Sequence, residues 1–183
     1  MDLQRKGQRV VVSGGSRGIG LADVGDEKWR NAWALKLFGC VKLIRAVLSA
    51  MVVRCAGGIC SIIGMAGAVP RSEYIFGSTA SAALMAFTHA VGGTNPQDGV
   101  RVLGVNPSPT HSDRMETMLR AQAARKLGDE HRWMELTKNL PFGRLMESSE
   151  VADLTVCGCS QLAGYLSGTV INLDGGQSFA SPA

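Results

Sequence analysis

The stretch from Arg9 to Gly20 reads RVVVSGGSRGIG, in which a short β-branched run is followed at once by spaced glycines. A continuous apolar run of this kind is typical of a strand buried on both faces of a parallel sheet. Gly14, Gly18 and Gly20 then predict a tight turn that leads into a helix. The free N–H groups and positive end of a helix favour a phosphate, and glycine lets the phosphate approach the backbone. We therefore favour a nucleotide-binding turn over a purely structural one.

Strands and helices alternate along the rest of the chain. Strands are expected at 58–64, 100–106 and 168–173, and helices at 78–91, 113–138 and 150–162, the last capped by Ser149. A longer amphipathic helix, capped by Asp26, ends near 55–58. Its apolar stripe, which we expect in the core, comprises Trp29, Trp33, Leu37, Val41, Ile44, Leu48 and Met51. The alternation predicts the α/β class, with a parallel sheet flanked by helices.

The composition of the 183 residues is that of one globular domain, 1–183. With 45% hydrophobic and 19% charged residues, a disordered or fibrous chain is excluded, and a dispersed net charge of +4 does not favour nucleic acid. The polar start and the lack of a run of about 18 apolar residues favour neither a signal peptide nor a membrane span. Five cysteines without paired spacing favour reduced thiols in a cytoplasmic protein. His89, His111 and His131 lie on separate elements, so we expect no metal site.

Five segments, in order, resemble the short-chain dehydrogenase/reductase family. Residues 13–20 resemble its cofactor motif, 29–51 its central interface helix and 58–67 its catalytic-serine strand. Residues 106–109 (Asn-Pro-Ser-Pro) resemble its Asn-Pro-Gly loop, and 141–152 with 167–176 its C-terminal end. The resemblance implies a Rossmann-like, doubly wound parallel sheet in three α/β/α layers, truncated here. It also implies hydride transfer between NAD(P) and a small-molecule alcohol or carbonyl substrate.

The resemblance assigns the cofactor to two loops. The glycine turn would bind its phosphates through Gly14, Ser16, Arg17, Gly18, Ile19 and Gly20. The loop after the 100–106 strand would hold the nicotinamide through Pro107, Thr110 and Ser112, with Ser108 in place of the usual glycine. Hydroxyl residues in a proline-rich loop are also common turn formers, so both interpretations stay open. Arg17 slightly favours NADP over NAD as the cofactor, since a guanidinium can bind the additional phosphate of NADP.

Part of the family's chain has no counterpart after the glycine turn. At about 30 residues for each strand–helix–strand unit, roughly 60 to 75 residues are missing. They would include the residue that reads the cofactor ribose and an Asn-Ala-Gly strand, and their loss would expose sheet edges. A natural deletion, an error in the gene sequence and an altered sequence would each produce this pattern.

The four residues that the family uses for catalysis (Asn, Ser, Tyr and Lys) are all replaced. Ala82-Ala83-Leu84 resembles the triplet after the family's lysine, which places Ser81 at the lysine position and Gly77 at the tyrosine position. Counting back along the chain places Gly64 at the serine position, and the segment 35–39 places Lys36 at the asparagine position.

Two interpretations of the replaced site compete. In the first, Tyr74 supplies the phenol from a shifted register, Ser78 follows it at the four-residue spacing, and Lys36 is a displaced cation. Such a site needs a cation that pulls a phenol pKa from about 10 towards neutrality. In the second, Tyr74 is a loop aromatic and Lys36 a surface lysine.

The sequence supports an enzyme and two rivals. The first rival is a catalytically inactive binding or assembly protein that kept the Rossmann scaffold, and the second is an unstable fragment. The family usually forms dimers or tetramers through the 29–51 helix and the Ala-rich helix, so a homodimer or homotetramer is expected. Residues 115–136 correspond to the family's mobile substrate lid, from which no substrate can be read.

Overall fold

The computed structural model describes residues 25–180. The expected strand before the glycine turn therefore lies outside the described residues. So do all the phosphate-binding candidates of that turn, which are Gly14, Ser16, Arg17, Gly18, Ile19 and Gly20.

Three parallel strands form the described sheet, in the order β1 (Gly57–Ile62), β2 (Val100–Pro107) and β3 (Thr169–Leu173). Gly57 pairs with Val100, and Leu103 pairs with Thr169. The central strand carries the core, since Val100, Val102, Leu103 and Val105 are fully buried. All three predicted strands downstream of the glycine turn are confirmed to within one or two residues.

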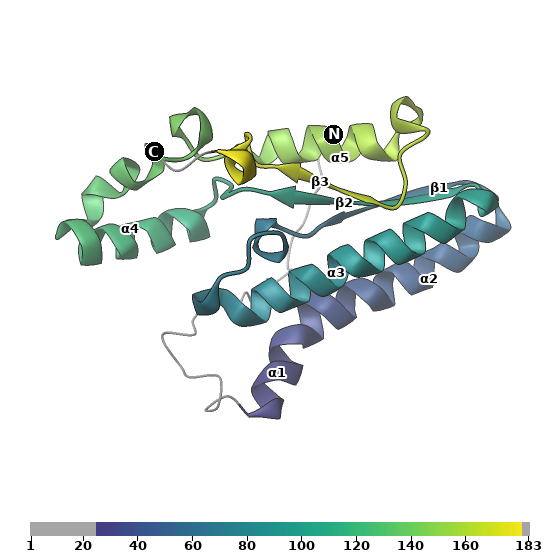
Figure 1. Cartoon of the computed structure of the whole chain (residues 1–183), viewed down its shortest axis with the longest axis horizontal. Helices are drawn as coiled ribbons and strands as arrows, with labels where there is room; N and C mark the ends of the chain where they lie inside the picture. Colours follow the sequence, from purple (N-terminus) through teal and green to yellow (C-terminus); the bar gives the residue numbers. More distant parts are fainter. Residues whose placement is uncertain (1–24, 181–183) are drawn as a thin grey trace.

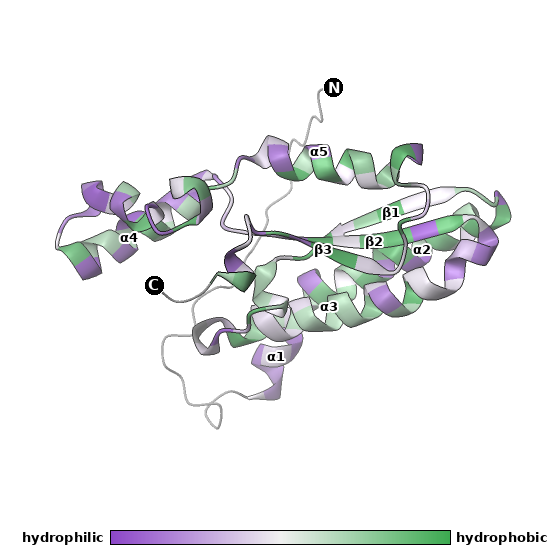
Figure 2. Ribbon diagram, turned by 45° about the horizontal axis from the view of Figure 1, so that its top comes forward, coloured by the Kyte–Doolittle hydropathy of each residue, from purple (hydrophilic) through white to green (hydrophobic). Residues whose placement is uncertain are grey.

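Helices cover both faces of this sheet, which confirms the predicted α/β/α layering (Figure 1). The layer on one face holds α2 (Cys40–Val53) and α3 (Ile75–Thr94), and α5 (Ser148–Cys159) covers the other. A helical arm extends past the carboxyl ends of the strands. It consists of α4 (Asp113–Leu127) and the 3₁₀ segment η6 (Glu130–Thr137). Helix α1 (Asp26–Trp33) is mainly hydrophilic, whereas α3 is largely apolar (Figure 2).

The expected long helix is present but contains a wider turn. It runs from α1 through the π-helical segment η2 (Ala34–Gly39) into α2. Of the predicted stripe only Ile44 is fully buried, and the other six residues are half-buried. Gly25 rather than Asp26 occupies the N-cap position, and Asp26 lies in the first turn.

Helix α3 extends three residues beyond each end of its predicted range. Its buried residues are mostly small: Gly77, Ser78, Ala80, Ser81, Leu84, Thr88 and Gly92. A Cβ added at Gly92 would overlap the Val102 carbonyl oxygen and the Gly168 backbone, so the helix meets the sheet here backbone to backbone. By length and composition Ile75–Asp98 could cross a membrane, which differs from the sequence expectation, although here it packs on β2 and β3.

The predicted Ser149 cap of α5 is wrong. The helix begins at Ser148 with Glu147 as N-cap, whose carboxylate accepts from the third helical N–H. In return Glu147 N–H donates to Glu150 Oε2 at 2.7 Å. This reciprocal pair satisfies two of the otherwise unpaired N–H groups at the helix start.

Arg101 on β2 ties the other end of α5 to the sheet. Its guanidinium donates to five backbone carbonyls, those of Gly158, Cys159, Ser160, Ala163 and Leu166, at 2.7–3.4 Å. A cation suits a helix C-terminus because the last carbonyls have no intrahelical partner and carry partial negative charge. Arg101 thus fixes both the end of α5 and the turn that leads to β3.

Replacing Arg101 should be costly. We expect Arg101→Met to lower the free energy of unfolding by about 2–4 kcal/mol, because the carbonyls lose charge-assisted hydrogen bonds. Urea denaturation measures the change. Arg125→Met is the control, since Arg125 is exposed on α4 and bonds only its own helix; its effect should stay within about 0.5 kcal/mol. Equal effects of the two variants would contradict the proposed role of Arg101.

Candidate active site

The start of α3 lies at the carboxyl edge of the sheet, and Tyr74 precedes it as the N-cap residue. The Tyr74 ring lies against Gly77, so that a Cβ added at Gly77 would overlap ring atoms Cε1, Cζ and Cδ1. The ring thus occupies the space that a side chain at position 77 would take. Gly77 is buried and Tyr74 is half-buried.

Lys36 reaches the same helix from the π-helical turn. Its Nζ donates to Ser81 Oγ at 2.7 Å, and Ser81 is fully buried. Burial lowers the pKa of Lys36 from its ordinary value of 10.5, because removing water disfavours the charged ammonium. The sequence placed Lys36 and Ser81 at family positions without linking them, and no local signal joins residues 45 positions apart.

The two contacts lie on one face of α3. Gly77 and Ser81 are four residues apart, a spacing that puts their positions one above the other on a helix. The phenol ring of Tyr74 and the ammonium of Lys36 therefore lie over adjacent turns, and both are delivered from outside α3. Two of the three predicted catalytic residues are brought to this face.

Ser78, the third predicted catalytic residue, is engaged elsewhere. Its hydroxyl accepts from the Arg71 N–H at 3.1 Å and lies 3.5 Å from the Arg71 carbonyl, and the residue is buried. These bonds fasten the turn that carries Tyr74. Gly64, at the family's serine position, has φ of +113°, a conformation that favours glycine over a residue with a side chain.

The loop after β2 has its own internal hydrogen bonds. The Ser108 N–H donates to the Leu173 carbonyl at 3.0 Å, and Thr110 Oγ1 donates to the Ser108 carbonyl at 2.9 Å. Ser112 Oγ accepts from Met115 N–H and caps α4. Pro107 ends β2. The hydroxyls of Thr110 and Ser112 thus make the local hydrogen bonds of turn-forming residues. The backbone of this loop lies at the carboxyl edge of the sheet.

One group in this loop fits a cofactor. Ser108 Oγ is buried and has no hydrogen-bond partner within residues 25–180. Since an unpaired buried hydroxyl costs about 1–3 kcal/mol, its position at the carboxyl end of the central strand suits a ligand that completes the bond. A nicotinamide carboxamide carries both donors and an acceptor, so these residues fit NAD or NADP.

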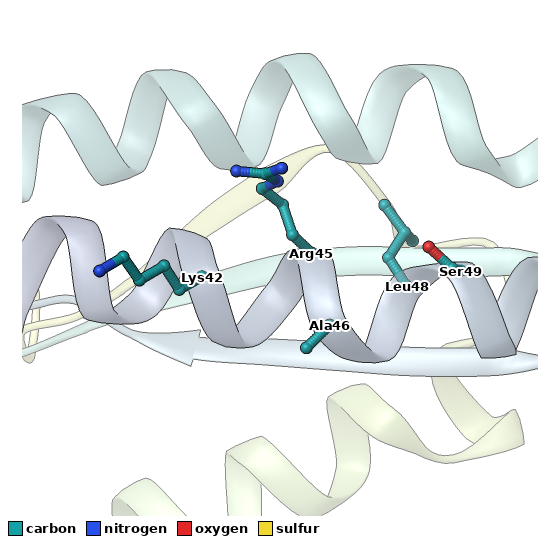
Figure 3. A pocket seen from close by; sticks show the side chains of 5 residues that line it. All are labelled: Lys42, Arg45, Ala46, Leu48 and Ser49. Atoms are coloured by element: carbon teal, nitrogen blue, oxygen red, sulfur yellow. The ribbon is translucent and has the colours of Figure 1, made fainter.

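Two hollows lie near charged residues. One, of about 290 Å³, adjoins this loop and is lined partly by Ser108, Arg144, Glu150 and Asp174. The other, of about 480 Å³, lies on the outer side of α2, and all five of its lining residues come from that helix: Lys42, Arg45, Ala46, Leu48 and Ser49 (Figure 3). The second is the larger, but its lining includes none of Tyr74, Gly77, Lys36 and Ser81.

Metal ligands do not gather in the described part of the chain. Within residues 25–180 no group of three or more His, Cys, Asp or Glu side chains could hold a metal ion. All five cysteines are free thiols. The expectation that the protein uses no metal stays a prediction.

A parallel sheet between two helical layers, with a polar loop at its carboxyl edge, defines the class of Rossmann-like α/β folds. The chain belongs to the short-chain dehydrogenase/reductase family: residues 10–178 match the family described as enoyl-(acyl carrier protein) reductase.

Several known proteins are similar to this chain. The galactitol 2-dehydrogenase (L-tagatose-forming) of Cereibacter sphaeroides is 31% identical over 153 residues, which are 82% of this chain and 57% of that protein. L-Sorbose reductase from Gluconobacter frateurii, solved with NADPH and L-sorbose, has a TM-score of 0.80 at 24% identity. The match covers 91% of this chain and 64% of the reductase chain.

A third similar protein has an unusual site of its own. The NADPH-bound short-chain oxidoreductase of Pseudomonas aeruginosa PAO1, described as containing an atypical catalytic center, has a TM-score of 0.74 at 25% identity. The match covers 88% of this chain and 61% of that one. The chain spans between 50% and 65% of the length of the curated relatives first in similarity, among them an oxidoreductase of Bacillus subtilis (65%) and one of Schizosaccharomyces pombe (50%).

The contact between Tyr74 and Gly77 can be tested directly. Gly77→Ala should expel the ring, lower the free energy of unfolding by about 1–3 kcal/mol and make Tyr74 more reactive towards nitration. Denaturation and mass mapping measure these effects. Gly93→Ala is the matched control, because Gly93 lies in the same helix with nothing within 4 Å of an added Cβ. The placement of the ring is contradicted if both variants behave alike.

The Arg144–Glu150 pair predicts a pH dependence. Two hydrogen bonds from Arg144 (2.8 and 2.9 Å), followed by the Glu147 N–H, lower the pKa of Glu150 from 4.5 to about 2. A carboxyl with a lowered folded-state pKa stabilises the fold above about pH 4.5, and this contribution is lost as the pH falls towards 2. Glu150→Gln should therefore flatten the fall in stability between pH 4.5 and 2 in acid titrations of unfolding. An unchanged slope would show that the pair does not couple to folding.

Proposed function

We propose that this protein transfers hydride between NAD(P) and an alcohol or carbonyl substrate. The observation that carries the proposal is the Tyr74 ring in the side-chain space of Gly77, one helical turn before Ser81, whose hydroxyl accepts a hydrogen bond from the Lys36 ammonium. Membership of an oxidoreductase family supports it. The names of its relatives, a polyol dehydrogenase and a ketose reductase, support polyols and ketoses as the first substrates to test.

The chain's own residues then act as binders and proton carriers. When bound, NAD(P) accepts or supplies the hydride. The Ser108 hydroxyl and the backbone after Pro107 would hold the nicotinamide side, and the glycine turn with Arg17 would hold the phosphates, with a preference for NADP. The Tyr74 phenol gives its proton to, or takes it from, the substrate oxygen. Lys36 supports the phenolate form electrostatically, and Ser78 positions the Tyr74 turn through Arg71.

We further propose a homodimer or homotetramer in the cytoplasm. The supporting surface is the outer side of η2 and α2, where Leu35, Phe38 and Leu43 are 59%, 47% and 65% exposed. Apolar side chains exposed together mark interaction sites more often than monomer surfaces. The five free thiols fit a reducing compartment.

Replacing the phenol tests the proposed reaction. Tyr74→Phe should reduce turnover of a polyol or ketose by at least about 100-fold, as expected for loss of a proton-transfer group. Its affinity for NADPH, measured by calorimetry, should stay within about twofold, since the ring remains. Tyr165→Phe is the control, because Tyr165 is fully exposed and is the only other tyrosine in the chain.

The same assays discriminate the rival functions. Turnover that survives in Tyr74→Phe would overturn the role of the phenol. Saturable NADPH binding by the unaltered protein, with no turnover of polyols or ketoses, would instead favour the inactive Rossmann-scaffold protein.

A further inference from the structure

We propose that Ser81 is a positioning residue that holds the Lys36 ammonium beside Tyr74, so that the cation of this site comes from the π-helical turn rather than from α3. The inference rests on the proposed function and extends it to a residue that would not itself touch the substrate.

Three contacts fix the long helix against α3 in one register. The Trp29 and Phe76 rings pack edge to face with centroids 4.6 Å apart. Trp33 Nε1 donates to Thr79 Oγ1 at 3.3 Å, and Lys36 Nζ donates to Ser81 Oγ at 2.7 Å. The contacts advance along both helices together, and the hydrogen bond of Lys36 to α3 falls at position 81.

The wider turn contributes to this arrangement. Lys36 lies within η2 (Ala34–Gly39), whose i→i+5 bonds turn each residue through a smaller angle than an α-helix does. Single π-helical turns within α-helices are frequent at functional sites. The Trp33 contact immediately precedes this turn and the Lys36 contact falls inside it, so the turn sets where the lysine side chain leaves the helix.

The partner of Lys36 is unusual for a structural lysine. Among the side chains that the structure describes, no carboxylate forms an ion pair with this ammonium, and its one hydrogen-bond acceptor is a neutral hydroxyl. Burying a cation without an opposite charge is costly. An ammonium has three donors, and Ser81 takes one, which leaves two for a phenolate or a ligand oxygen. Burial lowers the pKa of Lys36, in accord with this unpaired setting.

The space at position 81 can hold either the Lys36 ammonium beside a serine or the side chain of a lysine at 81, but not both. Ser81 is fully buried, and the Gly67 backbone packs closely on it. A lysine at 81 would need the space that the Lys36 ammonium occupies. An exchange of the two residues, Lys36→Asn with Ser81→Lys, should therefore return a cation to the same face of α3, whereas either change alone should not.

The first experiment measures the placement without turnover. The protein has six lysines, and ¹³C-methylation gives each an NMR signal that can be titrated, with Lys36 assigned by its loss in Lys36→Met. We expect Lys36 to titrate below the others and to shift again in Ser81→Ala. Lys42, which is exposed on the outer side of α2 (Figure 3), is the internal control and should not move. A Lys36 that titrates like Lys42 and ignores Ser81→Ala overturns the inference.

The second experiment measures the chemical consequence in the full chain. Lys36→Met should lower kcat by about 100-fold, and Lys36→Asn/Ser81→Lys should recover at least about tenfold of that loss. Ser81→Ala should shift the pH profile of kcat more than it changes KM, while Lys42→Met should match the unaltered protein.

The outcomes separate the two proposals. If the unaltered protein turns over substrate and Lys36→Met does too, the inference fails and the proposed function stands. If the NMR titrations couple Lys36 to Ser81 but no substrate is turned over, the proposed function fails and the placement by Ser81 stands.

Discussion

Every layer of this fold packs on β2, and this dependence constrains the rest of the structure. It is the one described strand with partners on both edges, and its apolar side chains are fully buried. Helix α3 meets it backbone to backbone at Gly92, and Arg101 extends from it to gather the end of α5. The loop that leaves its carboxyl end carries the unpaired Ser108 hydroxyl. The position of the candidate active site therefore follows from how this strand is held.

The small residues of α3 determine how the site is built. Gly77 and Ser81 are small, so they leave space on this face of α3. Tyr74 from the preceding loop and Lys36 from the neighbouring helix occupy that space. Such a site depends on tertiary contacts more than one whose residues share a helix. The aromatic and hydroxyl contacts between α1 and α3 therefore hold the helix that carries Lys36 against the face of the proposed site.

Periodicity and breakers in the sequence predict most of the described elements. Alternating strands and helices gave the three-layer arrangement because buried strands and amphipathic helices leave local patterns. The true cap of α5 was missed because glutamate is an uncommon N-cap and Glu147 is recognisable only through its exchange with Glu150. The π-helical turn was missed because its residues read as ordinary helix formers. Alignment with the family's motifs identifies Gly77, Ser81 and Lys36 as site positions. The hydrogen bond between Lys36 and Ser81 joins segments 45 residues apart, so it can be recognised only from the packing of the two helices.

Because Lys36 reaches the site from a facing helix, related chains should not be classified as active or inactive from the residues of one helix alone. A classification that asks whether a lysine stands four residues after a tyrosine inspects one helix in isolation. Such a rule would count this chain among the inactive members, because a serine, Ser81, occupies the position of the required lysine. The ammonium beside it belongs to Lys36, which lies 45 residues earlier in the facing helix. Chains with a small residue at that position warrant a search for compensating lysines in the facing helix, and the two positions should vary together among relatives. The unit under selection is then the pair of facing helices rather than a linear motif.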